Sequence, residues 1–176
     1  KLKDRNKELY TLANIDSLTK IRNRRSFFIE SEEALKIAIK KNNNLCVLMI
    51  DLDHFKSIND KYGHAIGDMV LIEFCVIVNL CLDNQAIFGR IGGEEFCITF
   101  FDKDIKEIND IAEKIRENCA NKQILLEKNE ILNFTVSMGL SCRENLNNID
   151  KILQKSDELL YEAKKSGRNR LIRFNR

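Results

Sequence analysis

The chain has 176 residues, of which 44% are hydrophobic and 32% are charged, a composition typical of a globular protein. This length is enough for one domain with a sizeable core and a short appendage. The formal net charge of +2 is too small to indicate binding to nucleic acid or to a membrane surface.

Six cysteines lie mostly in apolar runs, and none belongs to a Cys-x-x-Cys pair. We interpret them as small core residues in a reducing cytoplasm, with disulfides or zinc ligation as less favoured alternatives. No run reaches the length of a membrane span and no signal peptide opens the chain, so we expect a cytoplasmic domain without membrane contact. Because the sequence begins without Met, a longer parent protein, including one anchored in a membrane, stays open.

Residues 1–15 are predicted to form a charged amphipathic helix. Leu2, Leu9 and Leu12 are spaced for one face of a helix, and the first two are a heptad apart. Two interpretations stay open, a coiled-coil linker or a helix packed on its own domain. We therefore divide the chain into a helical linker segment over 1–15 and a main domain over 16–176.

The main domain is predicted to begin with a helix that Asp16 caps and that continues to about residue 41. Its expected buried side consists of Phe27, Phe28, Leu35 and Ile39. The next apolar run, 45–50, has the length of a strand and predicts a central strand covered on both faces.

Residues 51–67 are polar, and we expect them to be irregular apart from a short helix near 55–62. A strongly apolar helix is predicted over 68–82. Two β-forming runs within 86–101 enclose Gly92-Gly93-Glu94-Glu95 and predict a hairpin with its two glycines at positive φ. Two acids beside such a turn are unusual. Because the glycines have no side chains, a bulky anionic ligand and its metal ions can approach carboxylates at this position.

The rest of the chain is predicted to alternate between helices and strands. We expect a helix over 105–119, a strand over 132–141, a helix over 147–166 that Gly167 ends, and a strand over 171–174. Helices and strands interleave and include one tight hairpin, so the fold is of the α+β class with a mixed sheet.

Asp51 and Asp53 follow the predicted central strand, and period-two alternation places both on the same side. Together with the acids of the hairpin they resemble the way metal-dependent phosphoryl-transfer enzymes hold Mg²⁺, which takes hard oxygen ligands. The alternative is that these acids only make strand ends soluble.

Five motifs in this order resemble those of the GGDEF-type diguanylate cyclases and cover residues 16–172. They are Asp16-Ser-Leu-Thr19 with Asn23-Arg-Arg25, Asp51-Leu-Asp-His-Phe-Lys-Ser-Ile-Asn59 through Gly63, His64, Gly67 and Asp68, Gly92-Gly-Glu-Glu-Phe96, Ser137-Met-Gly139, and Ser156-Asp157 through Tyr161, Lys164, Gly167, Arg168 and Asn169. The resemblance implies a central five-stranded, mixed and mainly antiparallel sheet flanked by helices, similar to nucleotidyl cyclase and polymerase palm domains.

The resemblance also assigns roles to single residues. Asp51, the Leu52 carbonyl and Glu94 match the ligands of two Mg²⁺ ions, for which Mn²⁺ is an alternative. Glu95 matches a candidate general base, a role that a water molecule could also fill. The residues that match contacts to GTP are Lys56, Asn59, His64, Asp68, Gly92, Gly93, Lys164 and Arg168.

Among these, Asn59 and Asp68 match the pair that recognises guanine. An ionised carboxylate such as that of Asp68 suits this role, because it accepts hydrogen bonds from the N1–H and amino groups of guanine. Lys56, Lys164 and Arg168 match phosphate contacts. For His64, a structural hydrogen bond is an equal alternative. One motif is missing: many relatives carry RxxD nine residues before the first glycine, where product inhibits, whereas this chain has Asp83-Asn84-Gln85-Ala86.

The implied function is the condensation of two GTP into cyclic di-GMP and two pyrophosphates by a homodimer with facing active sites. Control by an upstream sensor domain would enter through residues 1–15. Two alternatives stay open. One is a catalytically silent GTP-binding regulatory module, and the other is a cyclase with a different product, which Asp68 disfavours.

Overall fold

The computed structural model describes residue 11, residues 13–143 and residues 146–174. The helix predicted over 1–15 therefore lies mostly outside the described residues, and the division of the chain at residue 15 stays a prediction.

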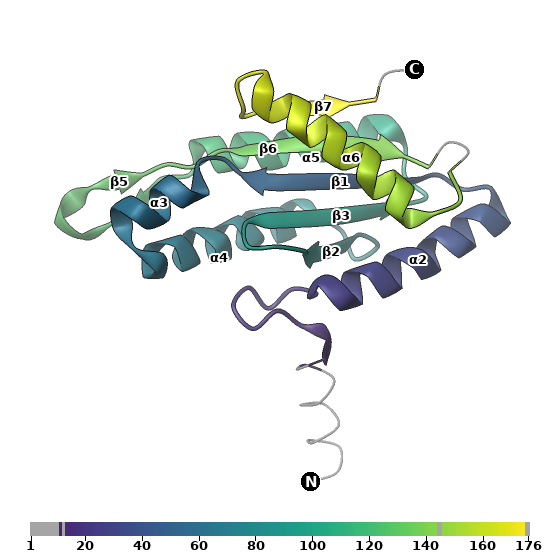
Figure 1. Ribbon diagram of the computed structural model, residues 1–176, viewed down its shortest axis with the longest axis horizontal. Coiled ribbons are helices and arrows are strands. Elements are labelled where there is room, and N and C mark those ends of the chain that lie inside the picture. The colour runs from purple at the N-terminus through teal and green to yellow at the C-terminus, as the bar shows by residue number, and fades with distance from the viewer. Residues whose placement is uncertain (1–10, 12, 144–145, 175–176) are drawn as a thin grey trace, which may run out of the picture.

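Within the described residues, five strands form one sheet in the order β2-β3-β1-β6-β7 (Figure 1). The strands are β1 (Leu45–Leu52), β2 (Ile87–Arg90), β3 (Glu95–Phe101), β6 (Val136–Cys142) and β7 (Leu171–Arg173). All pairs are antiparallel except β6 with β7. The predicted mixed, mainly antiparallel sheet is confirmed. A separate two-stranded ribbon joins β4 (Ile124–Leu125) to β5 (Ile131–Leu132) around a 3₁₀ turn at Glu127–Asn129.

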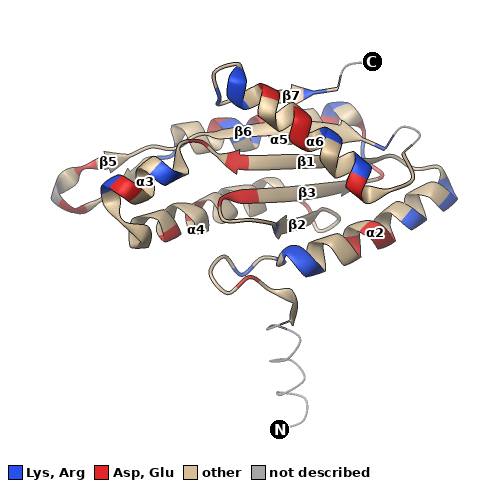
Figure 2. Cartoon of the chain, viewed as in Figure 1, with Lys and Arg blue, Asp and Glu red and all other residues tan. Residues whose placement is uncertain are grey.

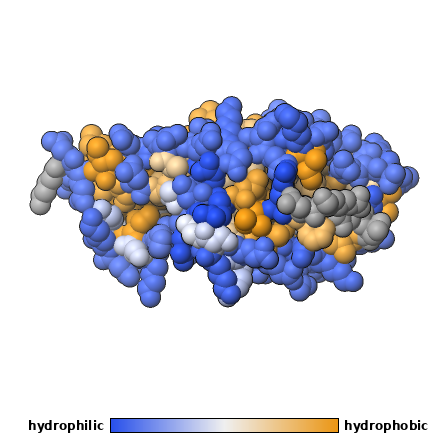
Figure 3. Space-filling model, turned by 90° about the horizontal axis from the view of Figure 1, so that it is seen from above, coloured by the Kyte–Doolittle hydropathy of each residue, from blue (hydrophilic) through white to orange (hydrophobic). Residues whose placement is uncertain are grey.

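Helices cover both faces of the sheet. They are α2 (Arg24–Lys41), α3 (Phe55–Tyr62), α4 (His64–Cys81), α5 (Ile105–Asn121) and α6 (Ile149–Lys165). Helices α2 and α6 pack on one face, and α4 and α5 pack on the other. Seen from above, the surface is mainly hydrophilic and its apolar residues form separate patches (Figure 3).

The central strand β1 separates two apolar layers by the alternation of its side chains. Leu48 and Ile50 belong to the core beneath α4 and α5, whereas Val47 and Met49 belong to the core beneath α2 and α6. All eight residues of β1 are buried, as predicted for a strand covered on both faces. By the same alternation Asp51 lies on the face of α2 and α6.

The predicted start of the first helix is wrong, because α2 begins at Arg24 with Asn23 as its N-cap. Asp16 instead closes a turn, in which its Oδ1 accepts hydrogen bonds from the Thr19 backbone N–H at 2.8 Å and the Thr19 hydroxyl at 2.6 Å. The predicted buried face is correct at Phe27 and Leu35. Ile39, however, is 39% exposed, and Ala38 lies in the core instead.

The apolar helix α4 begins four residues before its predicted start, directly after Gly63, whose φ of 84° reverses the chain between α3 and α4. Among the described helices, it alone is apolar and long enough to cross a membrane by length and composition, contrary to the expectation that no run has that length. Its inner side lies in the core, with the Phe74 ring 4.7 Å from the Phe96 ring. This packing is typical of a core helix.

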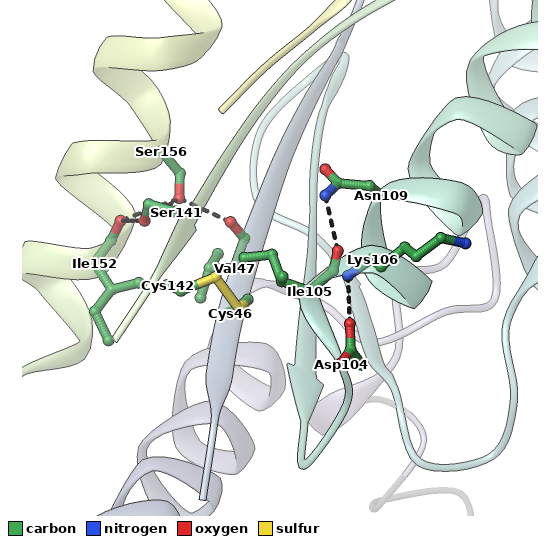
Figure 4. The surroundings of a disulfide bond; sticks show 10 residues. All are labelled: Cys46, Val47, Asp104, Ile105, Lys106, Asn109, Ser141, Cys142, Ile152 and Ser156. Atoms are coloured by element: carbon green, nitrogen blue, oxygen red, sulfur yellow. Dashed lines mark hydrogen bonds between the residues drawn. A yellow bond between two sulfur atoms is a disulfide. The ribbon is translucent and has the colours of Figure 1, made fainter. Parts of the chain in front are cut away.

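The expectation of six free cysteines is wrong for two of them. Cys46 and Cys142 form a disulfide between β1 and β6, where they are register partners with Cα atoms 3.9 Å apart (Figure 4). They are 96 residues apart in sequence, so no local spacing could indicate the pairing. The other cysteines, all in the described part of the chain, carry free thiols.

Gly139 on β6 allows the close approach of α6 to the sheet. A Cβ atom built there would lie 2.1 Å from the Ser156 carbonyl oxygen and 2.4 Å from the Leu160 backbone nitrogen. Gly139→Ala should therefore destabilise the fold by about 3 kcal/mol or more, because the backbone of α6 must move away. Thermal unfolding followed by circular dichroism measures this. The matched control is Gly93→Ala, whose Cβ would meet no atom within 4 Å; an equal loss in both variants would contradict the close packing.

Candidate functional site

Acidic residues meet where β1 ends and β3 begins (Figure 2). Asp51 and Glu95 are register partners in the antiparallel pair of β1 and β3, so their side chains lie on the same face of the sheet. Glu94 comes one residue before β3, and its carbonyl accepts a hydrogen bond from the Leu52 N–H at 3.3 Å. The two glutamates thus approach Asp51 from different positions of the turn.

Asp51 is a buried carboxylate with charged neighbours of both signs. Only 7% of the residue is exposed, and Lys164 Nζ lies 2.8 Å from Asp51 Oδ2. Burial raises the pKa of Asp51, the Lys164 ammonium opposes this, and the charges of Glu94 and Glu95 raise it further, so the pKa lies above its usual value. A cation bound among these carboxylates would relieve this repulsion.

The oxygen donors at this place suit Mg²⁺, which needs few protein ligands, better than a metal ion that is coordinated by protein side chains alone. The described residues contain no group of three His, Cys, Asp or Glu side chains arranged to hold a metal ion. Mg²⁺ is usually held by one or two carboxylates and completes its shell with water and phosphate oxygens. Asp51, one glutamate and a backbone carbonyl are hard oxygen donors of this kind.

Asp53, the second acid at the end of β1, faces protein donors. Its oxygens accept hydrogen bonds from the Thr135 hydroxyl at 2.7 Å, the Ser137 hydroxyl at 2.6 Å and the Asn169 backbone N–H at 3.0 Å. Two neighbouring acids that look alike in the sequence therefore have different surroundings.

Asn59 on α3 and Asp68 on α4 lie together where the two helices join. The Asn59 side chain packs against Gly67, because a Cβ at residue 67 would lie 1.9 Å from Asn59 Oδ1. Asp68 follows directly and is exposed. The fold thus places Asn59 beside Gly67, the residue before Asp68, and the missing side chain at residue 67 permits this approach.

The remaining residues predicted to contact substrate lie near the ends of helices. Lys56 and His64 are exposed in the first turns of α3 and α4. Lys164 is in the last turn of α6 and pairs with Asp51. Arg168 is half-buried in the turn that follows, at a φ of 63°.

Of the two glycines of the hairpin, Gly92 is required for a reason other than the predicted one. Neither Gly92 nor Gly93 has a positive φ, so that expectation is wrong. A Cβ at Gly92 would lie 2.3 Å from Glu95 Oε2, whereas one at Gly93 would meet no atom within 4 Å. Gly92 therefore leaves room for the side chain of Glu95.

Arg90, which the sequence did not single out, binds the backbone of the acidic turn through hydrogen bonds to its carbonyl oxygens. Its Nε donates to the carbonyl oxygens of Gly92 at 3.2 Å and Gly93 at 3.0 Å, and its Nη2 donates to Gly93 at 2.7 Å. Its Nη1 donates to Asp16 Oδ1 at 3.1 Å. A guanidinium has enough donors for all these contacts. The only signal in the sequence is an arginine two residues before the glycine pair.

Asp16 joins the segment before α2 to this turn. Partial burial would raise the pKa of Asp16, but hydrogen bonds from Thr19 and Arg90 and the charge of Arg90 outweigh it and hold the pKa below its usual value. The Asp-Ser-Leu-Thr motif therefore provides a charged anchor for Arg90.

At the first position of the missing RxxD motif, this chain has the acidic residue Asp83 in place of an arginine. Asp83 is paired with Lys103 Nζ at 2.6 Å, and Lys103 also contacts Glu107 at 2.8 Å. Hydrogen bonds from Lys103, against a small effect of burial, lower the pKa of Asp83. An ionised acid therefore occupies the position at which an RxxD motif would have its arginine.

Comparison with known proteins identifies the family of these motifs. The family model described as "Diguanylate cyclase, GGDEF domain" matches residues 13–170. Diguanylate cyclase A of Treponema denticola is 35% identical over 170 residues, covering 94% of this chain and 46% of that protein. A diguanylate cyclase of Vibrio cholerae is 36% identical over 163 residues, covering 93% of this chain and 50% of that protein. The chain thus spans about half the length of these relatives.

Solved structures of GGDEF domains have the same fold as this chain. The coiled coil and GGDEF domain of DgcB from Caulobacter crescentus, solved in complex with c-di-GMP, superposes with a TM-score of 0.94 at 27% identity, covering 98% of this chain and 92% of that one. The active GGEEF domain of a diguanylate cyclase from Vibrio cholerae superposes with a TM-score of 0.81 at 32% identity, covering 88% and 97%.

The ion pair between Asp16 and Arg90 should stabilise the fold in a pH-dependent way. Because the pKa of Asp16 is lowered on folding, its contribution is full above the unfolded value of about 3.9 and is lost as the pH falls through the folded value. Asp16→Asn should cost about 1 kcal/mol at pH 7 and less near pH 3. Urea unfolding at several pH values measures this, with Ser17→Ala as control. A loss that does not vary with pH would contradict the role of the charge.

Proposed function

Because the chain belongs to the GGDEF-domain family of diguanylate cyclases, we propose that it condenses two GTP into cyclic di-GMP and two pyrophosphates. The observation that carries this proposal is the meeting of Asp51 with the acidic turn, in register across β1 and β3 and next to Lys164. The reaction forms two phosphodiester bonds, each when a ribose 3′-hydroxyl displaces pyrophosphate from the α-phosphate of the other nucleotide.

Three groups at the strand ends would hold two Mg²⁺ ions, with Mn²⁺ as an alternative. They are the Asp51 carboxylate, the Leu52 carbonyl and the Glu94 carboxylate. When bound, such ions neutralise the triphosphate and polarise the α-phosphorus. The protein contributes a rigid acidic cluster, since Arg90 fixes the carbonyl groups of the turn that precedes Glu94 and Glu95.

Residues at the end of α6 would hold the phosphates. Lys164 supplies a point charge and Arg168 a planar fork of donors, and exposed Lys56 adds a further cation. Lys164 also pairs with Asp51. We expect it to turn toward phosphate oxygens when cations take over its partner.

Asn59 and Asp68 would recognise the guanine base. Asp68, as an acceptor, suits the N1–H and amino groups of guanine and would face the N1 acceptor of adenine unfavourably. Exposed His64 lies at the start of the same helix, within reach of a bound nucleotide. Gly92 and Gly93 would leave room for the nucleotide beside the turn.

Glu95 is the residue we propose as general base for the 3′-hydroxyl. This role is supported by its register pairing with Asp51, which puts both side chains on the same face of the sheet, and by its side chain lying against Gly92. Such a carboxylate can accept a proton from a hydroxyl that a nearby cation has made more acidic.

The product requires two domains, because each must supply a 3′-hydroxyl to the nucleotide on the other. We propose a homodimer with facing active sites, controlled by an upstream sensor domain. We also propose that the domain works in the cytoplasm, where GTP is available. The Cys46–Cys142 disulfide does not favour that location, since disulfides are rare in a reducing compartment.

Incubation with GTP and Mg²⁺ tests the reaction, with products separated by chromatography and identified by mass spectrometry. We expect cyclic di-GMP and pyrophosphate, a specific activity that rises with protein concentration, and no turnover after chelation of the metal. Glu94→Ala should lower the rate at least about a hundredfold.

Glu33→Ala, an exposed glutamate on α2, is the matched control and should leave the rate unchanged. Equal turnover by Glu94→Ala would refute the assignment of Glu94 to the metal. GTP binding without product from the parent chain would favour the silent regulatory module instead.

The acid at residue 83 predicts that product does not inhibit through this segment. Added cyclic di-GMP should leave the initial rate nearly unchanged, because Asp83 repels the phosphates that an arginine would bind. The combined change Asp83→Arg and Ala86→Asp rebuilds RxxD and should introduce inhibition, which steady-state rates measure. Strong noncompetitive inhibition of the parent chain would contradict this prediction.

A further inference from the structure

The Asp53 carboxylate is buried and turned toward other segments of the protein. It is 4% exposed and accepts hydrogen bonds from the side chains of Thr135 and Ser137 and from the backbone N–H of Asn169. A carboxylate only accepts hydrogen bonds, so these donors satisfy much of its capacity. A buried charge is retained when it is bonded in this way.

The turn that Asp53 holds has an unusual backbone. Gly167, Arg168 and Asn169 have φ values of 113°, 63° and 46° in succession. A residue other than glycine in this region is strained and persists when its surroundings enforce it. Here Asp53 holds the Asn169 N–H, and Arg116 Nη1 on α5 donates to Asn169 Oδ1 at 3.1 Å.

This turn carries Arg168 next to the acidic site. Lys164, four residues earlier, is 2.8 Å from Asp51, and Asp51 is two residues from Asp53. The end of β1 therefore contacts the C-terminal end of α6 twice, through Asp51 at Lys164 and through Asp53 at Asn169. The second contact fixes the direction in which the chain leaves α6, and so the place of Arg168.

We propose that Asp53 is a positioning residue, which acts through the Asn169 amide to hold Arg168 at the phosphate end of the nucleotide site. The proposal rests on the proposed function for the identity of the ligand. A carboxylate that only fastened β6 to β1 would support the whole fold, and its loss would weaken all ligands alike. A positioning residue acts selectively on the phosphates.

Asp53→Asn tests this, because it removes the charge and replaces one acceptor oxygen by an NH2 group, which weakens the charge-assisted bond that holds the Asn169 N–H. The probes are guanosine and the unreactive α,β-methylene analogue of GTP, with binding measured by calorimetry in Mg²⁺. We expect the dissociation constant of the analogue to rise about tenfold and that of guanosine to change less than about twofold. In the Arg168→Ala background, Asp53→Asn should have little further effect on the analogue.

Two further variants keep the test decisive. Thr135→Val removes one donor to Asp53 but leaves the Asn169 bond, so it should lower thermal stability without selective loss of the analogue. Arg116→Ala removes the other hold on Asn169 and should weaken the analogue selectively, even if Asp53→Asn fails to fold.

Equal weakening of both ligands, or additive effects of the Asp53 and Arg168 changes, would overturn the proposal. So would a parent chain that binds the analogue no more tightly than guanosine. A parent chain that binds the analogue but forms no cyclic di-GMP would refute the proposed reaction and leave the role of Asp53 standing.

Discussion

A carboxylate buried at the end of an otherwise apolar strand governs the arrangement of the site. Asp51 continues the face of β1 that packs beneath α2 and α6, and only 7% of the residue is exposed. Burial of a charge is costly unless a partner compensates for it. Lys164 supplies one positive charge, while Glu94 and Glu95 add negative charge. The fold thus maintains an excess of negative charge at a place with hard oxygen donors, which is the condition for binding a divalent cation.

Residues behind the ligand side give this cluster its rigidity. Arg90 binds two carbonyl groups of the acidic turn, and Asp16 anchors Arg90. Asp53 binds the turn after α6. The Asp16–Arg90 and Asp53–Asn169 contacts join segments that are far apart in the sequence. A site made of two strand ends and one helix end needs such links, because an error of about 1 Å in catalytic geometry can cost a hundredfold in rate.

The attachment of α6 to the sheet does not involve the disulfide, which joins β1 to β6. Ser141 and Ser156 hydrogen bond at 2.9 Å, and the Ser156 hydroxyl also donates to the Val47 carbonyl at 2.9 Å (Figure 4). Gly139 lets the helix approach the strand directly. If a reducing compartment opened the Cys46–Cys142 bond, these contacts would still hold α6, and with it Lys164, over the end of β1.

The sequence by itself determined the order of most elements and the residues that we propose for the site. Apolar runs and turn residues predicted β1, the hairpin, α3 and the final helix, because burial patterns and glycine preferences are local properties. Its motifs indicated Asp51, Glu94, Glu95, Asn59 and Asp68. Only the tertiary structure showed that Thr135, Ser137 and Asn169 bind Asp53, why Gly92 is a glycine, what Arg90 and Asp16 do, and that Cys46 and Cys142 pair. The contacts of Asp53, the Asp16–Arg90 pair and the disulfide join residues distant in sequence, so strand register and helix packing fix them. The contacts of Gly92 and Arg90 within the acidic turn depend on the exact conformation of that turn, which no residue pattern records.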